Sequence, residues 1–351
     1  MRLRSILAEP GLYFNRLLQE LDYRTSFRIS KPSEVWLKLT ERCNCRCAMC
    51  EIWQHNRTNE GELSTWDWMR VLKGLRSWLG PKHIWMTGGE PFLRPDAIEL
   101  IGHASGIGLS VGVITNGTIL KPEKMEALAA AGLREYHTSI DAMTPEIHDR
   151  LRGLPGAHKR ASNNVLALKD LRNRNGTGMK LVIKTIIMGV NADEIIPLVD
   201  WVEGNGFDEI KFQPLESNLE GNDDPLWFQK SSYWPKGDRL KNLLRVIDSL
   251  IARKDTGAPI YNSQQELRKM RDYFQDPVRV YEKVKAHVLG SDNDNSECRC
   301  AVGWMEILSR GELRFCRHMP GEGDVRLSSP RKLWRRRTAC WQNRTALCHK
   351  P

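Results

Sequence analysis

Three cysteines stand close together near the start of the chain, at the spacing C-x3-C-x2-C. They are Cys43, Cys47 and Cys50, and a fourth, Cys45, lies between them. We expect no secretory signal, and thiols this close suit a metal better than a disulfide. A zinc ion would need a fourth ligand, which Cys45 could supply. Three cysteines on a [4Fe–4S] cube would instead leave one iron open for chemistry, and structurally inert thiols are the remaining alternative.

A second motif, Thr87-Gly88-Gly89-Glu90-Pro91, follows later in the chain. Glycine has no β-carbon, so the ammonium group of a ligand could approach the backbone carbonyls of Gly88 and Gly89 closely. Glu90 could add a carboxylate partner for the same cation. Taken alone, the motif could also be a glycine-rich turn into a helix. Each motif directly follows a run that is typical of a buried strand.

Together, the two motifs resemble the radical S-adenosylmethionine (SAM) superfamily. The resemblance implies a [4Fe–4S] cluster on Cys43, Cys47 and Cys50, whose open iron binds the amino and carboxylate groups of SAM. It also implies that electron transfer cleaves a C–S bond of SAM to give a 5′-deoxyadenosyl radical, which abstracts hydrogen from a substrate. Met49 takes the position where the family usually has an aromatic residue, and we expect it beside the cofactor.

The resemblance implies further cofactor contacts at later loops. We expect Ser139 to hydrogen-bond the ribose or the carboxylate of SAM, and the forked guanidinium of Arg152 to pair with that carboxylate. Asn116 and Asn191 are candidates too, although asparagine is also common in turns for conformational reasons. Asp141 could contact the ribose or the substrate, act as a base, or cap the following helix. The sequence identifies no catalytic residue beyond these.

Strands and helices alternate from residue 35 onward, which indicates βαβ units and a parallel sheet. Six units fit an α/β fold with the partial (β/α)6 TIM-like barrel of the superfamily, its reactive loops at the C-terminal strand ends. The expected strands are Val35–Thr40, His83–Thr87, Leu109–Thr115, Glu135–Ile140, Lys180–Met188 and Glu209–Pro214. The expected helices between them are Thr65–Leu79, Asp96–Ala104, Lys121–Ala131, His158–Asn173 and Ala192–Asn205.

The chain divides into four expected regions. They are a helical extension (1–33), the radical SAM partial barrel (34–216), a helical linker or substrate-covering region (217–292) and a small cysteine-rich C-terminal domain (293–351). The third region should contain helices at Asp238–Lys254 and Gln264–Phe274. A basic run at 331–337 could grip an acidic peptide, a phosphate or a partner, or form an exposed helix face.

A second group of cysteines is confined to the C-terminal region: Cys298, Cys300, Cys316, Cys340 and Cys348. Between Cys300 and Cys316, residues 307–314 indicate a hairpin that turns at Arg310-Gly311. This arrangement resembles the opening of the SPASM and twitch domains, although the later cysteines of a full SPASM domain are missing. We expect one auxiliary [4Fe–4S] cluster on Cys300, Cys316, Cys340 and Cys348, with Cys298 as a substitute. There are two alternatives: a zinc site, or a three-cysteine cluster whose open iron binds substrate.

Composition narrows the class of protein. The formal net charge is +10, but acidic residues are spread among the basic ones, which does not indicate a nucleic-acid footprint. No apolar run approaches the roughly 20 residues that a membrane span needs. The nine cysteines without an expected secretion signal favour a reducing compartment, and so a cytoplasmic location.

These observations predict a radical SAM oxidoreductase that modifies a ribosomal peptide. Oxidation, epimerisation or methylation of a small sugar, nucleoside or natural-product intermediate is the alternative. The enzyme would need a low-potential electron donor such as flavodoxin or ferredoxin. Residues 1–33 are too few for a leader-binding domain, so a leader would dock elsewhere or on a separate protein. A zinc-stabilised binding scaffold is the alternative of another class, but it leaves the loop motifs without a purpose.

Overall fold

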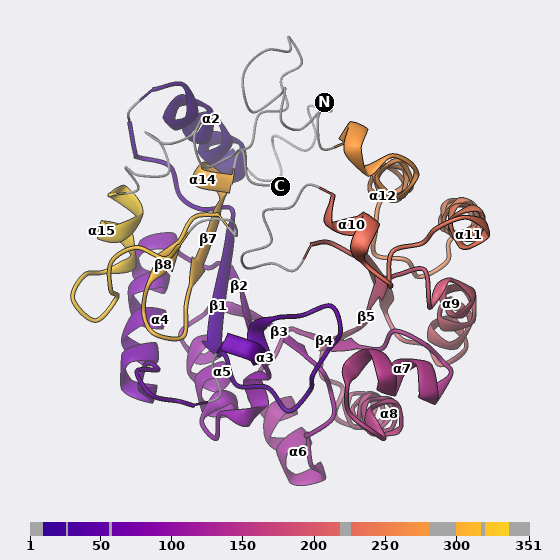
Figure 1. Cartoon of the computed structure of the whole chain (residues 1–351). Helices are drawn as coiled ribbons and strands as arrows, with labels where there is room; N and C mark the ends of the chain where they lie inside the picture. The colour runs from indigo at the N-terminus through magenta and orange to yellow at the C-terminus, as the bar shows by residue number, and fades with distance from the viewer. Residues whose placement is uncertain are drawn as a thin grey trace.

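An eight-stranded sheet forms the centre of the molecule (Figure 1). The computed structural model describes residues 10–25, 27–55, 58–217, 226–280, 300–316 and 320–336. Six strands run parallel in the order β6-β5-β4-β3-β2-β1, which confirms the predicted α/β fold and partial barrel. They are β1 (Glu34–Thr40), β2 (His83–Gly88), β3 (Ser110–Thr115), β4 (Glu135–Ser139), β5 (Lys180–Ile187) and β6 (Glu209–Pro214). Within the described residues the sheet does not close on itself.

Helices follow the strands and cover the outside of the sheet (Figure 1). They are α4 (Thr65–Leu79), α5 (Ala97–Gly106), α6 (Pro122–Ala130), α7 (Pro145–Arg152), α8 (Ala157–Asn175) and α9 (Ile195–Gly204). Three short elements lie in the connections: α3 (Ile52–His55), η1 (Pro91–Leu93) and η2 (Ala192–Glu194). Helix α4 begins with a capping box between Ser64 and Asp67, in which each side chain accepts the other's backbone N–H.

Alternation along the strands separates two environments. In β1, Val35, Leu37 and Leu39 are almost completely buried. The intervening residues Trp36 and Lys38 line the inside of the barrel, which we call the lumen. Successive side chains of a strand point to opposite faces, so one set packs under the helices and the other is available for function.

The C-terminal region adds two strands to the barrel sheet. β7 (Trp304–Ile307) pairs in parallel with β1, and β8 (Leu313–Arg314) pairs antiparallel with β7. The predicted hairpin is therefore confirmed. The pairing between β7 and β1 was not predicted, because β7 is short and lies far from β1 along the chain. This pairing brings Glu306 and Arg314 to the lumen beside Lys38.

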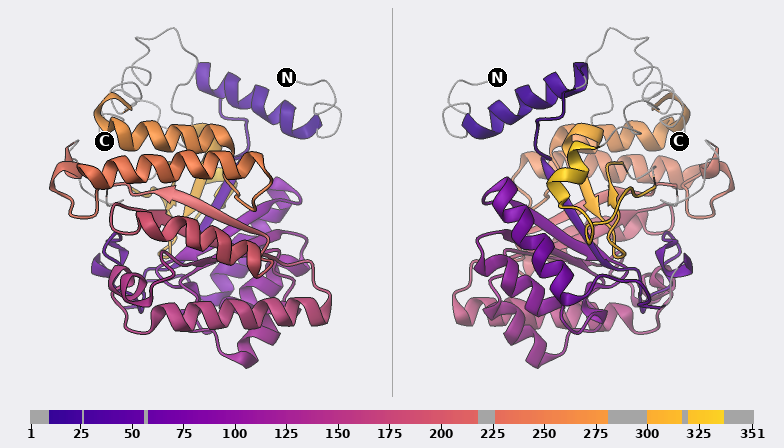
Figure 2. Two further views of the ribbon diagram at one scale, coloured as in Figure 1. Left: turned by 90° about the vertical axis from the view of Figure 1, so that its right-hand side faces the viewer. Right: turned by 90° about the vertical axis from the view of Figure 1, so that its left-hand side faces the viewer.

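The remaining helices lie at the edges of the sheet. After β6 come α10 (Trp227–Lys230), α11 (Asp238–Asp255) and α12 (Gln264–Gln275), and the last two, which were predicted, pack against each other (Figure 2). The C-terminal region contains α14 (Cys300–Gly303) and α15 (Pro330–Arg335). The basic residues Arg331, Lys332 and Arg335 are exposed on α15. This agrees with an exposed helix face, one of the two alternatives for the basic run at 331–337.

The N-terminal helix α2 (Pro10–Arg24) is joined to the C-terminal region through the segment that follows it. The Trp334 Nε1–H donates to the Ser30 carbonyl at 2.8 Å, and the Ser33 N–H donates to the Gly303 carbonyl at 2.7 Å. None of the helices in the described part of the chain has the length and apolar character needed to cross a membrane.

Candidate functional site

The cysteine loop leaves the carboxyl end of β1 and crosses the open end of the barrel, which we call the rim. Two polar groups approach the sulfur atoms of this loop. The Asn116 Nδ2 lies 3.9 Å from the Cys43 Sγ, and an Arg152 guanidinium nitrogen lies 3.9 Å from the Cys47 Sγ. Hydrogen-bond donors beside sulfur fit thiolate ligands, because they stabilise the negative charge.

The acidities of the four loop thiols differ. Hydrogen bonding with Cys45 lowers the pKa of Cys43. The same kind of hydrogen bond, together with the nearby positive charge of Arg152, lowers the pKa of Cys47 to about 6. The same hydrogen bonds raise the pKa of Cys45, and burial raises that of Cys50 to about 11. Cys45 is therefore the hydrogen-bond partner of both Cys43 and Cys47.

The loop also lacks the geometry of a single-ion site. Among the described residues, no three His, Cys, Asp or Glu side chains converge as they would around one metal. In a cube each cysteine binds a separate iron, so the three sulfurs stand farther apart. The thiols, their spacing and the donors beside them fit a [4Fe–4S] cluster better than zinc.

The glycine motif lies directly against the cysteine loop. A β-carbon at Gly88 would lie 2.2 Å from the Thr40 carbonyl oxygen, and one at Gly89 would lie 2.2 Å from that of Arg42. The backbone N–H groups of Gly89 and Glu90 donate to these two carbonyls, each at 2.8 Å. The glycines thus let two backbones meet, a reason that the sequence did not reveal. Contact of Gly88 and Gly89 with the cofactor stays a prediction.

Glu90 is completely buried and joins the loops after β2 and β3. Its carboxylate accepts hydrogen bonds from the Thr115 hydroxyl and the Asn116 N–H, both at 2.8 Å. Burial raises the pKa of Glu90 to about 7, against the lowering effect of these hydrogen bonds. The Asn116 side chain in turn donates to Asn44 of the cysteine loop at 2.8 Å. Glu90 and Asn116 therefore position the cysteine loop, and their direct contact with SAM stays a prediction.

Arg152 and Asp141 form a buried ion pair beside the cluster loop. The Asp141 carboxylate lies 2.7 Å from the guanidinium of Arg152 and accepts the Ile186 N–H at 3.0 Å. Ser139 ends β4, two residues before Asp141, and is buried at the same rim. The structure therefore brings Ser139, Asp141 and Arg152 together next to Cys47. Their contacts with SAM stay predictions.

Asp141 does not cap the helix that follows it. At the start of α7, the N–H groups of Met143 and Thr144 donate to Glu194, each at 2.9 Å. Glu194 follows β5, so it ties the residues just before α7 to a segment that is distant in sequence, while α7 itself has no side-chain cap.

Asn191 is buried and uses its whole amide group in holding strand ends together. The amide nitrogen donates to the carbonyls of Asp141 and Ile186, at 2.8 and 2.9 Å. Its oxygen accepts the Met188 N–H at 2.8 Å. These contacts support a role in positioning Asp141, and a direct contact of Asn191 with SAM stays a prediction.

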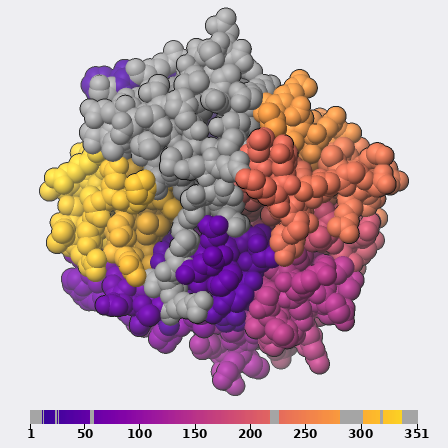
Figure 3. Space-filling model, viewed as in Figure 1, coloured from indigo at the N-terminus to yellow at the C-terminus, as the bar shows by residue number. Residues whose placement is uncertain are grey.

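Met49 is buried at the edge of an open cavity beside the rim. The lining residues come from the cluster loop and from the segment after β6: Ala48, Met49, Leu215, Glu216, Trp227, Lys230, Ser231, Ser232 and Tyr233. In the space-filling view, the cluster loop reaches the surface between the C-terminal region (yellow) and the helices after β6 (orange) (Figure 3). This cavity, which we call the mouth, gives access to the rim from solvent.

The second cysteine group is only partly described. Cys316 follows β8 and is buried, and the backbone of Cys300 begins α14. Cys298, Cys340 and Cys348 lie outside the described residues, as does the Cys300 side chain. The ligands of the auxiliary cluster stay predictions.

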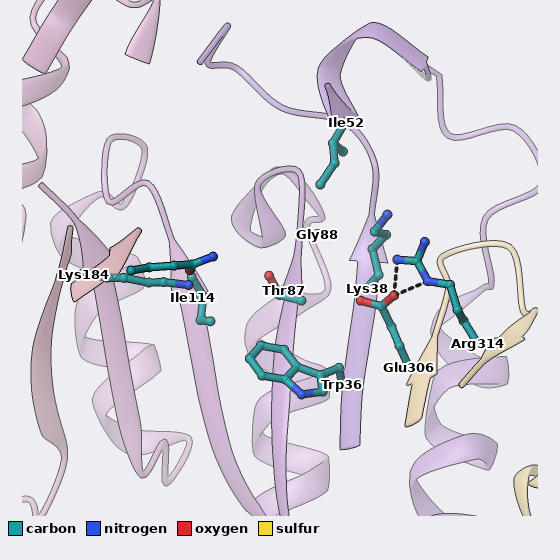
Figure 4. A pocket seen from close by; sticks show the side chains of 10 residues that line it. Trp36, Lys38, Ile52, Thr87, Gly88, Ile114, Lys184, Glu306 and Arg314 are labelled. Atoms are coloured by element: carbon teal, nitrogen blue, oxygen red, sulfur yellow. Dashed lines mark hydrogen bonds and ion pairs between the residues drawn. The ribbon is translucent and has the colours of Figure 1, made fainter. Parts of the chain in front are cut away.

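A second cavity, which the sequence did not reveal, occupies the lumen below the glycine motif (Figure 4). It encloses about 690 Å³, part of which is open to solvent. The lining residues are Trp36, Lys38, Ile52, Thr87, Gly88, Ile114, Lys184, Gln213, Glu306 and Arg314. The available signal was the alternation of apolar Val35, Leu37 and Leu39 with Trp36 and Lys38, together with the charged or polar residues at 209, 211 and 213, which marks an inward face.

Comparison with known proteins identifies the domain that carries the rim. The radical SAM superfamily model matches residues 37–202, which include both motifs and the loops after the first five strands. Residues 37–202 therefore form a radical SAM domain. The chain is therefore an enzyme that binds SAM and a [4Fe–4S] cluster.

Two curated relatives differ in how much of them is matched. AdoMet-dependent heme synthase from Methanosarcina barkeri is 29% identical over 316 residues, which cover 86% of this chain and 82% of that protein. PqqA peptide cyclase from Rhodopseudomonas palustris is 38% identical over 127 residues, which cover 36% of this chain and 33% of that protein. The chain thus matches only about a third of the cyclase.

Solved structures share the fold. Streptococcus suis SuiB bound to its precursor peptide SuiA has a TM-score of 0.64 at 17% identity, over 90% of this chain and 67% of that one. The enzyme anSMEcpe with bound AdoMet has a TM-score of 0.61 at 16% identity, over 86% of this chain and 80% of that one. At these identities the comparison shows a common architecture.

Proposed function

We propose that this radical SAM enzyme matures a ribosomally made peptide by removing hydrogen from one of its C–H bonds. The observation that carries the proposal is the open mouth beside Met49, which would let an extended chain reach the rim. The local similarity to PqqA peptide cyclase over the radical SAM domain supports the same substrate class.

A [4Fe–4S] cluster held by Cys43, Cys47 and Cys50 would supply the electron that cleaves SAM, which is the difficult part of the chemistry. The protein holds the cysteine loop in place through the bonds of Glu90 and Asn116. Arg152 keeps a positive charge beside Cys47. The apolar and aromatic residues of the mouth, Met49, Leu215 and Trp227, would exclude water from the reacting carbon once a substrate is bound.

The reaction class that we propose is a net two-electron oxidation or a crosslink. One hydrogen atom of the substrate would leave to form 5′-deoxyadenosine. A second hydrogen would leave as a proton, and its electron would pass to an auxiliary cluster and then to an external acceptor. The product would lack a pair of hydrogen atoms. The electron that first cleaves SAM would come from a donor such as flavodoxin or ferredoxin.

A small-molecule substrate is the second candidate. It is favoured by the alignment with the heme synthase, which covers most of both proteins, whereas the cyclase match is local. On this reading the substrate would be a tetrapyrrole or another small organic compound that enters the lumen.

One experiment separates the two candidates. The reconstituted, reduced enzyme is given SAM together with precursor peptides encoded near its gene or, separately, with porphyrins. The rate of 5′-deoxyadenosine formation and the mass of each substrate are then measured. The peptide proposal expects a peptide to accelerate formation and to lose a pair of hydrogens. Acceleration by porphyrins alone would overturn it in favour of the second candidate.

A further inference from the structure

The lumen cavity has an excess of positive charge. Three of its lining side chains are cationic, Lys38, Lys184 and Arg314, against the single carboxylate of Glu306, which leaves a net formal charge of +2. Arg314 donates from Nε and from a terminal nitrogen to one oxygen of Glu306, and both side chains are nearly buried. Glu306 and Arg314 pair with each other, and Lys38 and Lys184 supply the other two positive charges of the lining.

The two lysines enter the cavity from opposite walls. Figure 4 shows Lys184 reaching in from β5 and Lys38 rising from β1 beside the Arg314–Glu306 pair. Lys38 is almost completely buried, and its ammonium group has the Glu41 carboxylate 3.9 Å away. A cavity with walls of one sign of charge and low dielectric attracts a ligand of the opposite sign.

The floor of the cavity is rigid and aromatic. The rings of Trp36 and Trp85 stack at 5.6 Å, and His137 lies edge-on to Trp85 at 4.7 Å. Gly112 makes room for this floor, because a β-carbon there would lie 2.5 Å from the Trp85 ring. The floor limits how far a ligand can reach, so the cavity suits a short arm of a molecule.

The upper wall is apolar and lies next to the cofactor motif. Ile52 and Gly88 line the space above the lysines, and Ile114 lies on the wall beside Lys184 (Figure 4). An anionic group held by the lysines would therefore place its aliphatic arm against the isoleucines. The adjoining C–H bonds would lie near the loop that binds SAM.

We propose that the lumen cavity binds a carboxylate on a short aliphatic arm of the substrate, with Lys184 and Lys38 as its recognition groups. The inference rests on the proposed radical chemistry and deepens it by naming the acidic group that anchors the substrate. The carboxylate belongs either to a glutamate or aspartate side chain of a peptide or to a small organic acid.

Calorimetric titration of the reconstituted enzyme, with SAM at saturation, tests the inference. The probes are glutarate and its neutral counterpart glutaramide, and the saturating cofactor keeps either probe out of the SAM site. We expect glutarate to bind at least about tenfold more tightly than glutaramide. Lys184→Gln should weaken glutarate binding about tenfold, and Lys184→Arg, which keeps the charge, should retain most of it.

Lys180→Gln is the matched control. Lys180 lies on the same strand and pairs with Glu209 rather than lining the cavity, so its loss should leave glutarate binding unchanged. The inference fails if the two probes bind equally, or if Lys184→Gln and Lys180→Gln have the same effect. Thermal unfolding of each variant shows whether a loss of binding comes from a loss of folding.

A second pair of probes separates the sources of the carboxylate. N-acetyl-Gly-Glu-Gly-amide and its Gln counterpart are titrated in the same way. Tight binding of the Glu peptide supports an acidic peptide side chain. Binding of glutarate but not of the Glu peptide supports the cavity inference while contradicting the peptide proposal. The formation of 5′-deoxyadenosine is measured separately, so a failure of the radical chemistry is distinguishable from a failure of the cavity inference.

Discussion

The rim and the lumen of the barrel use polar residues in different ways. At the rim, the side chains of Glu90, Asn116 and Asn191 form hydrogen bonds that hold neighbouring loops together. In the lumen, Lys38 and Lys184 line a cavity beside the glycine motif. The difference teaches that the rim is a fixed frame for the cofactor, whereas the lumen is the part that can select a substrate. Changes at the rim should therefore abolish the chemistry, and changes in the lumen should alter what is bound.

The largest effect is expected from Gly89→Ala at the rim. The new β-carbon would lie 2.2 Å from the Arg42 carbonyl oxygen and 2.6 Å from its carbon, and backbone atoms held by the sheet cannot move aside. The cysteine loop would be pushed away from β2. We expect SAM cleavage to fall more than about 100-fold, with a loss of about 1–3 kcal/mol in the free energy of unfolding. Activity within tenfold of the wild type would contradict the close fit of the two loops.

Glu90→Gln should change how stability depends on pH. The folded pKa of Glu90, about 7, lies above its ordinary value of 4.5 because burial disfavours the charged form. The stability that this group contributes is therefore present below pH 4.5 and is lost as the pH rises toward 7, by about 3 kcal/mol. Urea unfolding of the cluster-free protein at several pH values should show this decline in the wild type and not in Glu90→Gln. If the free energy of unfolding depended on pH in the same way in both proteins, the raised pKa of Glu90 would be refuted.

Gly112→Ala applies the same change to the lumen. Its β-carbon would meet the Trp85 ring at 2.5 Å and the His83 ring at 2.9 Å, but side chains can turn aside where backbone cannot. We expect a loss of about 1 kcal/mol in the free energy of unfolding, a wild-type iron content and an altered affinity for glutarate. A loss of iron as large as that of Gly89→Ala would remove the distinction between rim and lumen.

The smallest effect is expected from Gly102→Ala in α5. The nearest atom to its β-carbon would be the Ala131 β-carbon at 3.8 Å, an ordinary contact. Alanine favours the helix by up to about 1 kcal/mol relative to glycine. Thermal unfolding should show equal or higher stability, with unchanged activity, which makes this variant the control for the other two glycines. A clear destabilisation would show that alanine is costly even where the chain has room for it.

The sequence predicted the frame of the molecule better than its contacts. Six strands, their parallel order and the loops at their ends follow from local patterns of apolar and polar residues. The pairing of β7 with β1 does not, because it depends on contacts between distant segments. For the same reason, the hydrogen bonds from the segment before α7 to Glu194 could not be predicted from nearby residues.

The candidate site shows the same limit. The three cysteines and the two glycines are visible as motifs, but the backbone that fills the space beside Gly89 is visible only in the structure. Lys184 and Arg314 stand in no motif, and they meet only because β5 and β8 face one lumen. A rule that marks charged residues at inward positions of strands would have found them.

The most direct test compares the reconstituted wild type with the Cys43→Ala/Cys47→Ala/Cys50→Ala variant by iron analysis and by electron paramagnetic resonance of the reduced protein. We expect the wild type to hold about four more irons per chain than the variant. Addition of SAM should change the wild-type signal, because the cofactor binds the open iron, and should leave the variant unchanged. Equal iron contents, or a wild-type signal that SAM does not alter, would contradict a SAM-binding cluster on these three cysteines.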